Sequence, residues 1–572
     1  MSVELIIKNF VKYTVCGLLL FATVFIIVYT CNDEKRMMDF FLHSSYFIIL
    51  SIVVVWIVAC IEYFIAHNVN LLCYLKKNWV GLVISLCFTI CVFSSVKVYF
   101  KFLRDETNLL SISKSMYEKQ ECRNVLQAKN VFGKTRIIQW SRTKRPLVFP
   151  FLVNVLHTLT GYRYYNPFVL NFFLMWAFLY HIFRIVRSIL GFWPGLSSIL
   201  LILSCPVISI VATSAGFDFF HVVFLCFSLY VTYLFIKHND NITFVLLWAT
   251  MVVLSNIRYE SFLCFIVVFS LLIIMKFIKW SHIRDNLLLI CTTPIFFLPF
   301  LWQRIFSLGS SLPEEGKIFS WVHFRNHFLI FLKAMFKFDL YLPYNNILMV
   351  LSFAVCFYLL FLLFKNGIKL TEQRSCFVVI LVIVCSIFIG LYFAYFYGNC
   401  LKAFAMRRFL LISVLSAFSP LIIRAYFPKV LSNKRLLALS LFLFLLYFPV
   451  ASNGEKVENL HLAQRTDICF KFIKKYAKDN NIMVITDRTG RFTALGYGSV
   501  SFNYANKSYT IPVEFKKHLY STIFVIQRIQ TDTFEPIEED LLDPKYKLSV
   551  LDEIQYSSNN FLRISQVVGL NE

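Results

Sequence analysis

Two adjacent carboxylates, Asp105 and Glu106, directly follow an apolar run that ends near residue 101. A carboxylate at the point where a membrane helix meets water can serve as a general base, because it can take the proton of an attacking hydroxyl group. Partial burial against apolar groups raises the pKa of such a base, since burial disfavours its charged form. The alternative interpretation is that the pair are ordinary solvated charges at a helix end.

Asp218 is a third candidate, because it lies between two apolar runs. A charged residue costs about 2.5–3.5 kcal/mol at the centre of a bilayer and less near its surface, so it usually faces a cavity or a partner. His221 lies one helical turn further and is a candidate partner for Asp218. The alternative for His221 is a packing role in an apolar helix.

Several arginines lie at predicted helix ends. Arg145 precedes a proline, Arg258 and Glu260 flank a tyrosine between two apolar runs, and Arg407 and Arg408 begin a late run. The planar guanidinium fork binds phosphate oxygens in pairs, which favours a phosphate-bearing ligand. The alternatives are that Arg258 and Glu260 pair with each other and that the other arginines extend toward lipid headgroups.

The amino-acid composition indicates the class of protein whose structural elements must position these residues. The chain has 572 residues, of which 58% are hydrophobic and only 15% charged. These values exclude a soluble enzyme and a disordered chain. The net charge is +24, which fits cationic loops beside anionic lipids and a phosphate-bearing substrate. We expect membrane lipids as partners and no nucleic acid.

The sequence predicts an all-α polytopic membrane protein. A membrane-spanning helix needs about 20 apolar residues, and about thirteen segments meet that length. They lie near 12–30, 43–66, 79–101, 164–187, 195–213, 218–236, 242–257, 262–279, 286–302, 346–364, 376–396, 409–426 and 436–452.

The excess of Lys and Arg in alternate loops places the N-terminus in the cytoplasm. An odd number of spans then places the polar tail outside. We expect a small α/β domain there, with a helix over 461–480, strands over 482–486 and 522–527, and a hairpin over 546–568. Its expected role is that of a lid or docking platform.

Four parts follow from these boundaries: N-terminal spans (1–101), a first large outer loop with the candidate carboxylates (102–163), a transmembrane core (164–452) and the extracytoplasmic domain (453–572). The first outer loop contains two amphipathic segments, and the loop over 303–345 is rich in aromatic residues. We expect these segments to be interfacial helices.

The chain has 16 cysteines, most of them inside apolar runs, where they are small apolar side chains. Neither paired CxxC motifs nor a Cys/His cluster with zinc spacing occurs in the sequence. The sequence therefore predicts neither a disulfide framework nor a metal site.

Four landmarks, taken in order, resemble the GT-C glycosyltransferases, in particular relatives of the protein O-mannosyltransferases and of the transferases that place aminoarabinose on lipid A. The first is Asp105-Glu106 with Leu109, Ser113 and Met116. The others are the stretch from Arg145-Pro146 to Gly161, the loop from Ser214 to Asp218, and Arg408-Phe409-Leu410-Leu411.

The chain differs from the relatives at two landmarks. Lys144-Arg145-Pro146 has a single proline where many relatives have two, and Arg258 stands where many carry a lysine. The donor and the acceptor therefore stay open.

This resemblance implies a GT-C fold and the transfer of a sugar from a polyprenyl-phosphate donor to a glycan, lipid or protein acceptor. The reaction would take place on the outer face of a bacterial cytoplasmic membrane. Asp105 would act as the base on the acceptor hydroxyl or bind close to it, and Glu106 and Asp218 would be further catalytic residues. Arg145, His221, Arg258, Glu260, Arg407 and Arg408 would bind substrate, and the arginines would hold the phosphate leaving group without a metal or another cofactor.

Three other functions remain open at this point. A lipid or glycan transporter or flippase would also have many spans, but such folds often show internal repeats and mid-span charges, which this sequence lacks. A polysaccharide polymerase would carry one large outer loop late in the chain. A non-catalytic scaffold would use the outer tail as a binding module.

Overall fold

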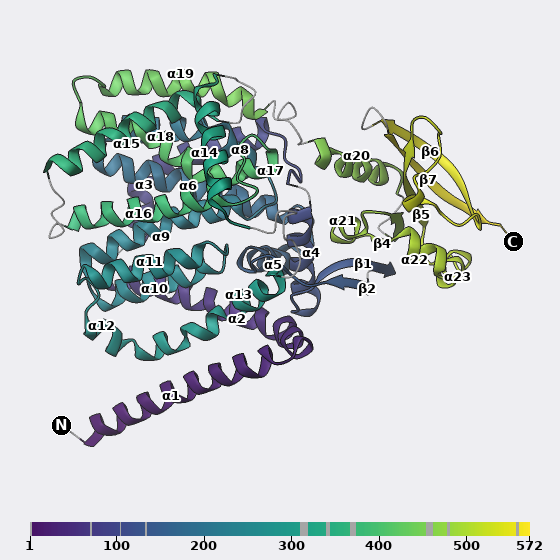
Figure 1. The fold of residues 1–572 in the computed structure, drawn as a ribbon, viewed down its shortest axis with the longest axis horizontal. Coiled ribbons are helices and arrows are strands. Elements are labelled where there is room, and N and C mark those ends of the chain that lie inside the picture. The colour runs from purple at the N-terminus through teal and green to yellow at the C-terminus, as the bar shows by residue number, and fades with distance from the viewer. Residues whose placement is uncertain are drawn as a thin grey trace. The chain divides into compact units, whose positions relative to one another are not determined.

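The computed structural model describes residues 3–68, 71–102, 104–131, 134–308, 318–338, 344–366, 373–452, 461–477, 481–555 and 560–571. Its backbone divides into two compact units. The membrane unit comprises Met1–Val98, Lys144–Phe151 and Phe168–Asn459, and the sheet unit comprises Tyr99–Thr143, Leu152–Pro167 and Leu460–Glu572. Figure 1 labels most of the elements of both units.

The membrane unit is built from helices. They are α1 (Val3–Cys31), α2 (Glu34–Ala66), α3 (Leu71–Ser95), α6 (Asn166–Leu190), α7 (Phe192–Leu203), α8 (Pro206–Ala212), α9 (Asp218–His238), α10 (Asn241–Ser255), α11 (Ser261–Ile274), α12 (Trp280–Asp285), α13 (Leu287–Leu308), α14 (Trp321–Phe336), α15 (Asn346–Asn366), α16 (Gln373–Ala394), α17 (Ala403–Met406), η1 (Arg407–Phe409), α18 (Leu410–Tyr426) and α19 (Asn433–Ser452).

Each of the thirteen predicted segments coincides with a helix or a helix pair of this unit. Within the described residues, nine helices are long and apolar enough to cross a membrane, and the bent pair α7–α8 makes a tenth candidate. The other three segments correspond to the shorter apolar helices α10, α11 and α15. The predicted fold class, a polytopic helical protein with a small C-terminal sheet domain, is confirmed.

A local rule explains the bend of 74° between α7 and α8. Pro206 is the first residue of α8 and has no backbone N–H to continue α7. It also forces Cys205 into an extended conformation. The predicted span over 195–213 is therefore a broken one.

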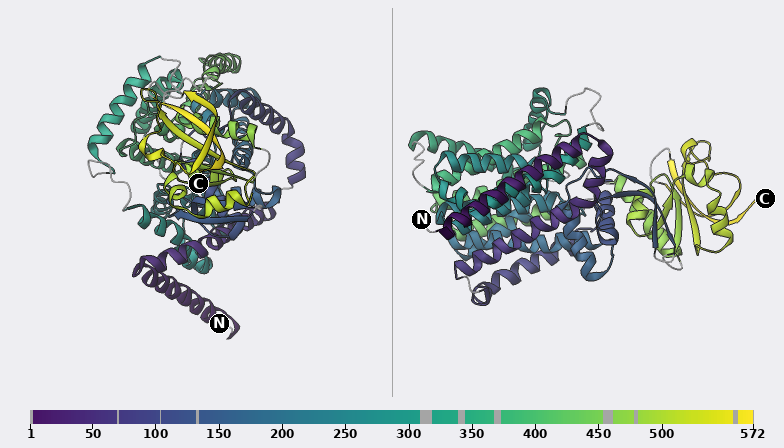
Figure 2. Two further views of the ribbon diagram at one scale, coloured as in Figure 1. Left: turned by 90° about the vertical axis from the view of Figure 1, so that its right-hand side faces the viewer. Right: turned by 90° about the horizontal axis from the view of Figure 1, so that it is seen from below.

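Packing inside the membrane unit brings helices from distant parts of the chain together. α10 packs against α2, α9 and α11, and α19 packs against α7. α1 lies along the outside of the unit, against α13 and α2 (Figure 2). Phenylalanines such as Phe219, Phe235 and Phe244 fill the interior, which accounts for part of the high aromatic content.

The sheet unit holds a seven-stranded sheet with the order β2-β1-β4-β3-β5-β7-β6. Its elements are α4 (Arg104–Lys119), β1 (Asn124–Val131), β2 (Lys134–Ser141), α5 (Val148–Thr160, most of it), α20 (His461–Tyr476), β3 (Ile482–Thr486), α21 (Thr489–Ala494), β4 (Gly498–Val500), α22 (Phe502–Lys507), α23 (Thr510–Lys516), β5 (Thr522–Gln530), η3 (Glu538–Asp540), β6 (Tyr546–Gln555) and β7 (Asn560–Leu570).

β3 is central and runs parallel to β4 and β5, whereas β7 and β6 add to β5 in antiparallel fashion. All five residues of β3 are buried, as expected for a strand covered on both faces. The expected helix, strands and hairpin of the tail are all present. Residues 478–480 of the expected helix lie outside the described residues.

The loop over 102–163 contributes two strands to this same sheet. β1 and β2 form an antiparallel hairpin, and β1 pairs with β4 through Ala128 and Ser499. α4 packs against β1 and α21, and its apolar residues Leu109 and Met116 are buried there. This pairing joins segments more than 300 residues apart into one unit. The sequence did not predict it.

Candidate functional site

Asp218 lies at the centre of a buried charge cluster in the membrane unit. It occupies the first turn of α9, and only 1% of its side chain is exposed. Its Oδ1 accepts a hydrogen bond from Arg258 Nη1 at 2.8 Å, and its Oδ2 accepts one from Arg407 Nη1 at 3.1 Å. Each carboxylate oxygen thus has its own arginine, which offsets the cost of burying the charge.

The turn before α9 holds Asp218 in this position. Asn171 on α6 donates its side-chain amide to the backbone carbonyl of Ser214 at 2.7 Å and to that of Gly216 at 3.2 Å. These bonds fasten the buried loop that leads into α9. The landmark loop from Ser214 to Asp218 is therefore held in place by Asn171, which the sequence did not indicate as a site residue.

His221, the candidate partner of Asp218, binds a different residue. His221 is buried, and its Nε2 forms a hydrogen bond of 2.8 Å with Ser261 Oγ at the start of α11. The reason is geometric, because two arginines from other segments already occupy both oxygens of Asp218. His221 joins α9 to α11 instead.

Arg258 lies in the turn between α10 and α11 and binds two carboxylates. Besides its bond to Asp218, its Nη2 and Nε lie 3.2 and 3.3 Å from the two carboxylate oxygens of Glu260. Burial raises the pKa of Glu260, but attraction to Arg258, a backbone hydrogen bond and attraction to Arg408 together outweigh burial and lower that pKa to about 2. Glu260 is therefore ionised, and Arg258 is held on both sides.

Arg408 has a different environment from Arg258. It lies in η1 at the start of α18, and its guanidinium carbon is 4.0 Å from the centre of the Tyr395 ring. Its Nη1 reaches the carbonyl of Tyr397 only at 3.4 Å. Its buried Nε has no hydrogen-bond acceptor among the described residues. Within the described residues, Arg408 therefore has unused donor capacity.

The cluster carries an excess of positive charge. Three arginines (258, 407 and 408) against two carboxylates (218 and 260) leave a net charge of +1 when all are ionised. An incoming anion would balance that excess, and guanidinium groups are well shaped to hold a phosphate. The arrangement is therefore suited to binding a phosphate group at the ends of α9, α10 and α18.

Arg145 is placed beside this cluster by its backbone. Its carbonyl accepts a hydrogen bond of 2.6 Å from Gln303 on α13, and the carbonyl of Lys144 accepts one from the Tyr259 hydroxyl. Tyr259 directly follows Arg258 in the chain. The membrane unit thus contains every predicted site residue except Asp105 and Glu106.

Asp105 and Glu106 lie in the first turn of α4, in the sheet unit. Glu106 is fully buried, and its Oε2 accepts the backbone N–H of Phe102 at 3.2 Å. This bond satisfies a donor just before the helix, where a negative charge is also favoured by the helix dipole. Asp105 is only partly buried. The two neighbours therefore differ in accessibility.

His157 on α5 is a buried histidine of the sheet unit that sequence reasoning missed. Its Nδ1 accepts from the backbone N–H of Arg163 at 3.4 Å and lies 2.8 Å from the amide of Asn166. The ring proton is therefore on Nε2, which donates to Ser113 Oγ at 3.2 Å. This tautomer cannot take a proton from Ser113, so the group fastens α4 to α5 and is no nucleophile–base pair.

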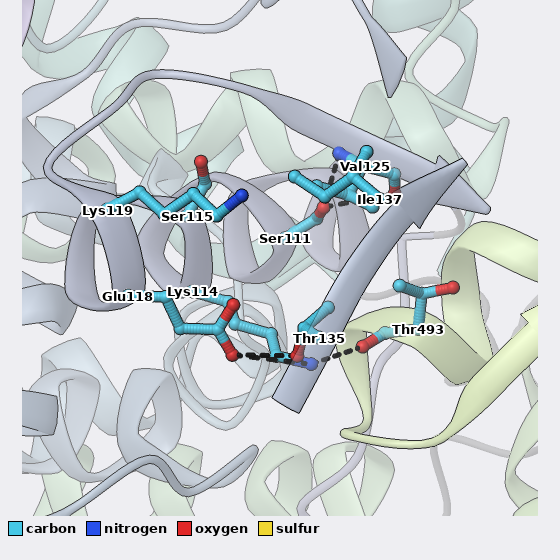
Figure 3. Close-up of a pocket in the computed structure, with 9 residues that line it drawn as sticks. All are labelled: Ser111, Lys114, Ser115, Glu118, Lys119, Val125, Thr135, Ile137 and Thr493. Carbon is cyan, nitrogen blue, oxygen red and sulfur yellow. Dashed lines mark hydrogen bonds and ion pairs between the residues drawn. The ribbon is translucent and has the colours of Figure 1, made fainter. Parts of the chain in front are cut away.

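A small cavity of about 10 Å³, room for one water molecule, lies between α4, β2 and α21 (Figure 3). Lys114 Nζ donates to the carbonyl of Thr493 at 3.1 Å and lies 3.9 Å from Glu118 Oε1. Thr135 donates to the same carboxylate at 3.1 Å. Burial lowers the pKa of Lys114. These polar groups bind one another, so the cavity is a structural junction.

Comparison with known proteins supports the class of protein that the helices and charges suggest. Residues 144–302 match the family described as dolichyl-phosphate-mannose-protein mannosyltransferase. That range contains Arg145, Asp218, Arg258 and Glu260. No curated protein matches the chain.

Solved structures share the fold. ArnT from Cupriavidus metallidurans, solved with undecaprenyl phosphate bound, aligns with a TM-score of 0.50 and 12% identity over 85% of this chain and 98% of that chain. The oligosaccharyltransferase of Archaeoglobus fulgidus aligns with a TM-score of 0.46 and 10% identity over 84% of this chain and 72% of that chain.

The family match and the ArnT-like fold together indicate a membrane glycosyltransferase of the GT-C class. Within that class the chain resembles the protein O-mannosyltransferases and ArnT. The resemblance drawn from the sequence landmarks is confirmed.

Proposed function

We propose that the chain transfers a sugar from a polyprenyl-phosphate-linked donor to a cell-envelope acceptor on the outer face of a bacterial cytoplasmic membrane. The observation that carries this proposal is the buried cluster around Asp218, with its excess positive charge. A lipid phosphate supplies the missing negative charge. The ArnT relative was solved with a ligand of this chemistry.

In this proposal the arginines have separate roles. Arg258 is bound to Asp218 and Glu260, so it fixes the ends of α9, α10 and α11. Arg408 has unused donor capacity and is assigned to the phosphate of the donor. As the sugar leaves, the lipid phosphate gains negative charge, and a positioned guanidinium stabilises it more in the transition state than in the ground state.

Asp105 is proposed as the general base toward the acceptor hydroxyl. Its partial exposure lets a substrate reach it, whereas the buried carboxylate of Glu106 is bound to the backbone of Phe102. Proton removal during attack makes a sugar hydroxyl, or another hydroxyl acceptor, a competent nucleophile. Glu106 then acts as a positioning residue for the first turn of α4.

The proposal is tested by measuring the binding of undecaprenyl phosphate to the purified full-length chain by native mass spectrometry. We expect Arg408→Lys to weaken binding about tenfold, because a point charge cannot reproduce the guanidinium fork. Arg424→Lys, at the other end of α18, is the matched control and is expected to bind normally. Equal affinity in the wild type and Arg408→Lys would contradict the assignment.

Transfer itself is tested with radiolabelled polyprenyl-phosphate sugars and membrane fractions that contain acceptors. We expect loss of label from the lipid only with the wild type and not with Asp105→Asn. The proposed reaction would be contradicted if well-folded wild-type protein turned over none of the hexose, pentose and aminopentose donors.

A further inference from the structure

A second group of polar side chains lies at the opposite end of α9 from Asp218. It consists of His67, His238 and Asp240, all in the membrane unit. α9 has 21 residues, so the group is about 30 Å along the helix from Asp218. The group is therefore separate from the proposed phosphate site.

His67 directly follows α2, and its two ring nitrogens have different surroundings. Nδ1 lies 3.1 Å from the backbone carbonyl of Tyr63, which can only accept, so Nδ1 carries the proton. In the neutral ring Nε2 then has a lone pair, and it lies 3.6 Å from Asp240 Oδ2. A histidine that donates one N–H to a carbonyl and offers its other nitrogen is the usual arrangement of a metal ligand.

Asp240 is also held with one oxygen available. It is the N-cap of α10, where its Oδ1 accepts the backbone N–H of Thr243 at 2.8 Å. Its Oδ2 is the atom that faces His67. The cap thus fixes the carboxylate without using the oxygen on the side of the histidine.

His238 completes the group through the turn between α9 and α10. Asn239, between His238 and Asp240, has a φ of 50°, which is left-handed and which asparagine tolerates. The His238 ring lies 4.8 Å from the His67 ring, centre to centre. The three ligand atoms all lie within 4.8 Å of one another.

These distances are close to those of a metal centre. Ligands about 2.0–2.1 Å from a tetrahedral zinc ion are about 3.4 Å apart. His67 and Asp240 already have nearly that separation, and the exposed ring of His238 can rotate to close the remainder. We propose that His67, His238 and Asp240 bind one divalent first-row metal ion of the zinc type, with the fourth position open to water.

Such an ion would join two segments of the membrane unit. His67 ends α2, whereas His238 and Asp240 flank the turn between α9 and α10. Only the fold brings them together, which is why no spacing in the sequence predicts the site. A ligand that binds the folded chain alone stabilises it by mass action, so the metal would act on stability and not on the sugar transfer.

The site is tested by titrating the purified, chelator-treated full-length protein with Co²⁺, whose visible absorption reports four-coordinate nitrogen and oxygen ligands, and then displacing it with Zn²⁺. We expect one Co²⁺ per chain and an increase of the unfolding temperature with Zn²⁺. His238→Gln and Asp240→Asn should each weaken binding by on the order of tenfold or more and remove the increase in unfolding temperature.

Two features keep the test decisive. Asn caps a helix as well as Asp, so Asp240→Asn removes the charge and keeps the start of α10. His43→Gln, at an exposed histidine of the same helix α2, is the matched control and should bind like the wild type. The proposal is overturned if Co²⁺ binds both site variants with wild-type affinity, or if the wild type binds none at micromolar concentration.

Discussion

The guanidinium carbon of Arg408 lies 4.0 Å from the centre of the Tyr395 ring, so the arginine is stacked on an aromatic face rather than paired with a carboxylate. A cation–π contact of this kind contributes about 1–2 kcal/mol when water is excluded. The ring holds the cation in place without neutralising its charge. Arg408 thereby keeps its attraction for an anion.

The first prediction concerns this stacking. Tyr395→Leu should weaken the binding of undecaprenyl phosphate about tenfold, because Arg408 loses the surface that orients it. Tyr395→Phe keeps the ring and should bind like the wild type. Native mass spectrometry or a thermal-shift titration measures the affinities. Similar losses in both variants would show that the hydroxyl group, and not the ring, supports binding.

The second prediction concerns the carboxylates of α4. Asp105→Asn should leave the protein folded and lower the transfer rate about 10²–10⁴-fold, the usual contribution of a positioned base. Glu106→Gln should cost less, because a glutamine oxygen can still accept the N–H of Phe102. Initial rates with labelled donor measure both. If Asp218→Asn alone abolished transfer, Asp218 would become the base.

The third prediction separates the structural arginine from the binding one. Arg258→Met removes the partner of the partly buried Glu260 and leaves the buried Asp218 with a single arginine, so it should destabilise the fold by about 3–5 kcal/mol. Thermal unfolding in detergent should show a clear fall in Tm. Arg408→Met, which breaks no ion pair among the described residues, should change Tm much less. An equal fall in Tm for both variants would contradict the separate structural and binding roles of Arg258 and Arg408.

The fourth prediction is a pH dependence of the sheet unit. Burial lowers the pKa of His157 to about 4, from an ordinary value of 6.5. Between these two values the unfolded chain binds a proton that the folded chain does not, so stability falls as the pH drops from 6.5 to 4. Hydrogen exchange of the α5 amides should accelerate over that range. In His157→Gln this acceleration should be smaller.

The fifth prediction concerns topology. Reporter fusions at Lys365 and after Gly454 should report opposite compartments, with Lys365 in the cytoplasm, because Lys and Arg are in excess in the predicted cytoplasmic loops. Phosphatase and fluorescent-protein reporters measure this. Reporters in the same compartment at both positions would contradict the odd number of spans.

Much of the fold could be predicted because its signals are local. A run of apolar residues long enough for a bilayer identifies a helix wherever it lies, and β3 was predicted with its observed bounds, Ile482–Thr486. The strands β1 and β2 lack a clean alternation of buried and exposed residues. Their membership of the C-terminal sheet depends on a pairing that no local pattern records.

The candidate site could likewise be predicted where its signals are local and not where they depend on long-range contacts. Charges at the ends of apolar runs indicated Asp218, Arg258 and Arg408, because a charge at that place is costly without a function or a partner. The partners themselves could not be read from the sequence. Spacing along one helix suggested His221 for Asp218, whereas the fold supplies Arg258 and Arg407.

The pairing of Ala128 with Ser499 also has a consequence for biosynthesis. A ribosome adds roughly 5–20 residues per second, so the β1–β2 hairpin emerges roughly 20–70 s before the strand that it pairs with. During that interval its edge has no partner and can pair with other chains. Chains that stop before residue 498 would keep that edge open, and their removal by membrane quality control should be faster than that of full-length chains.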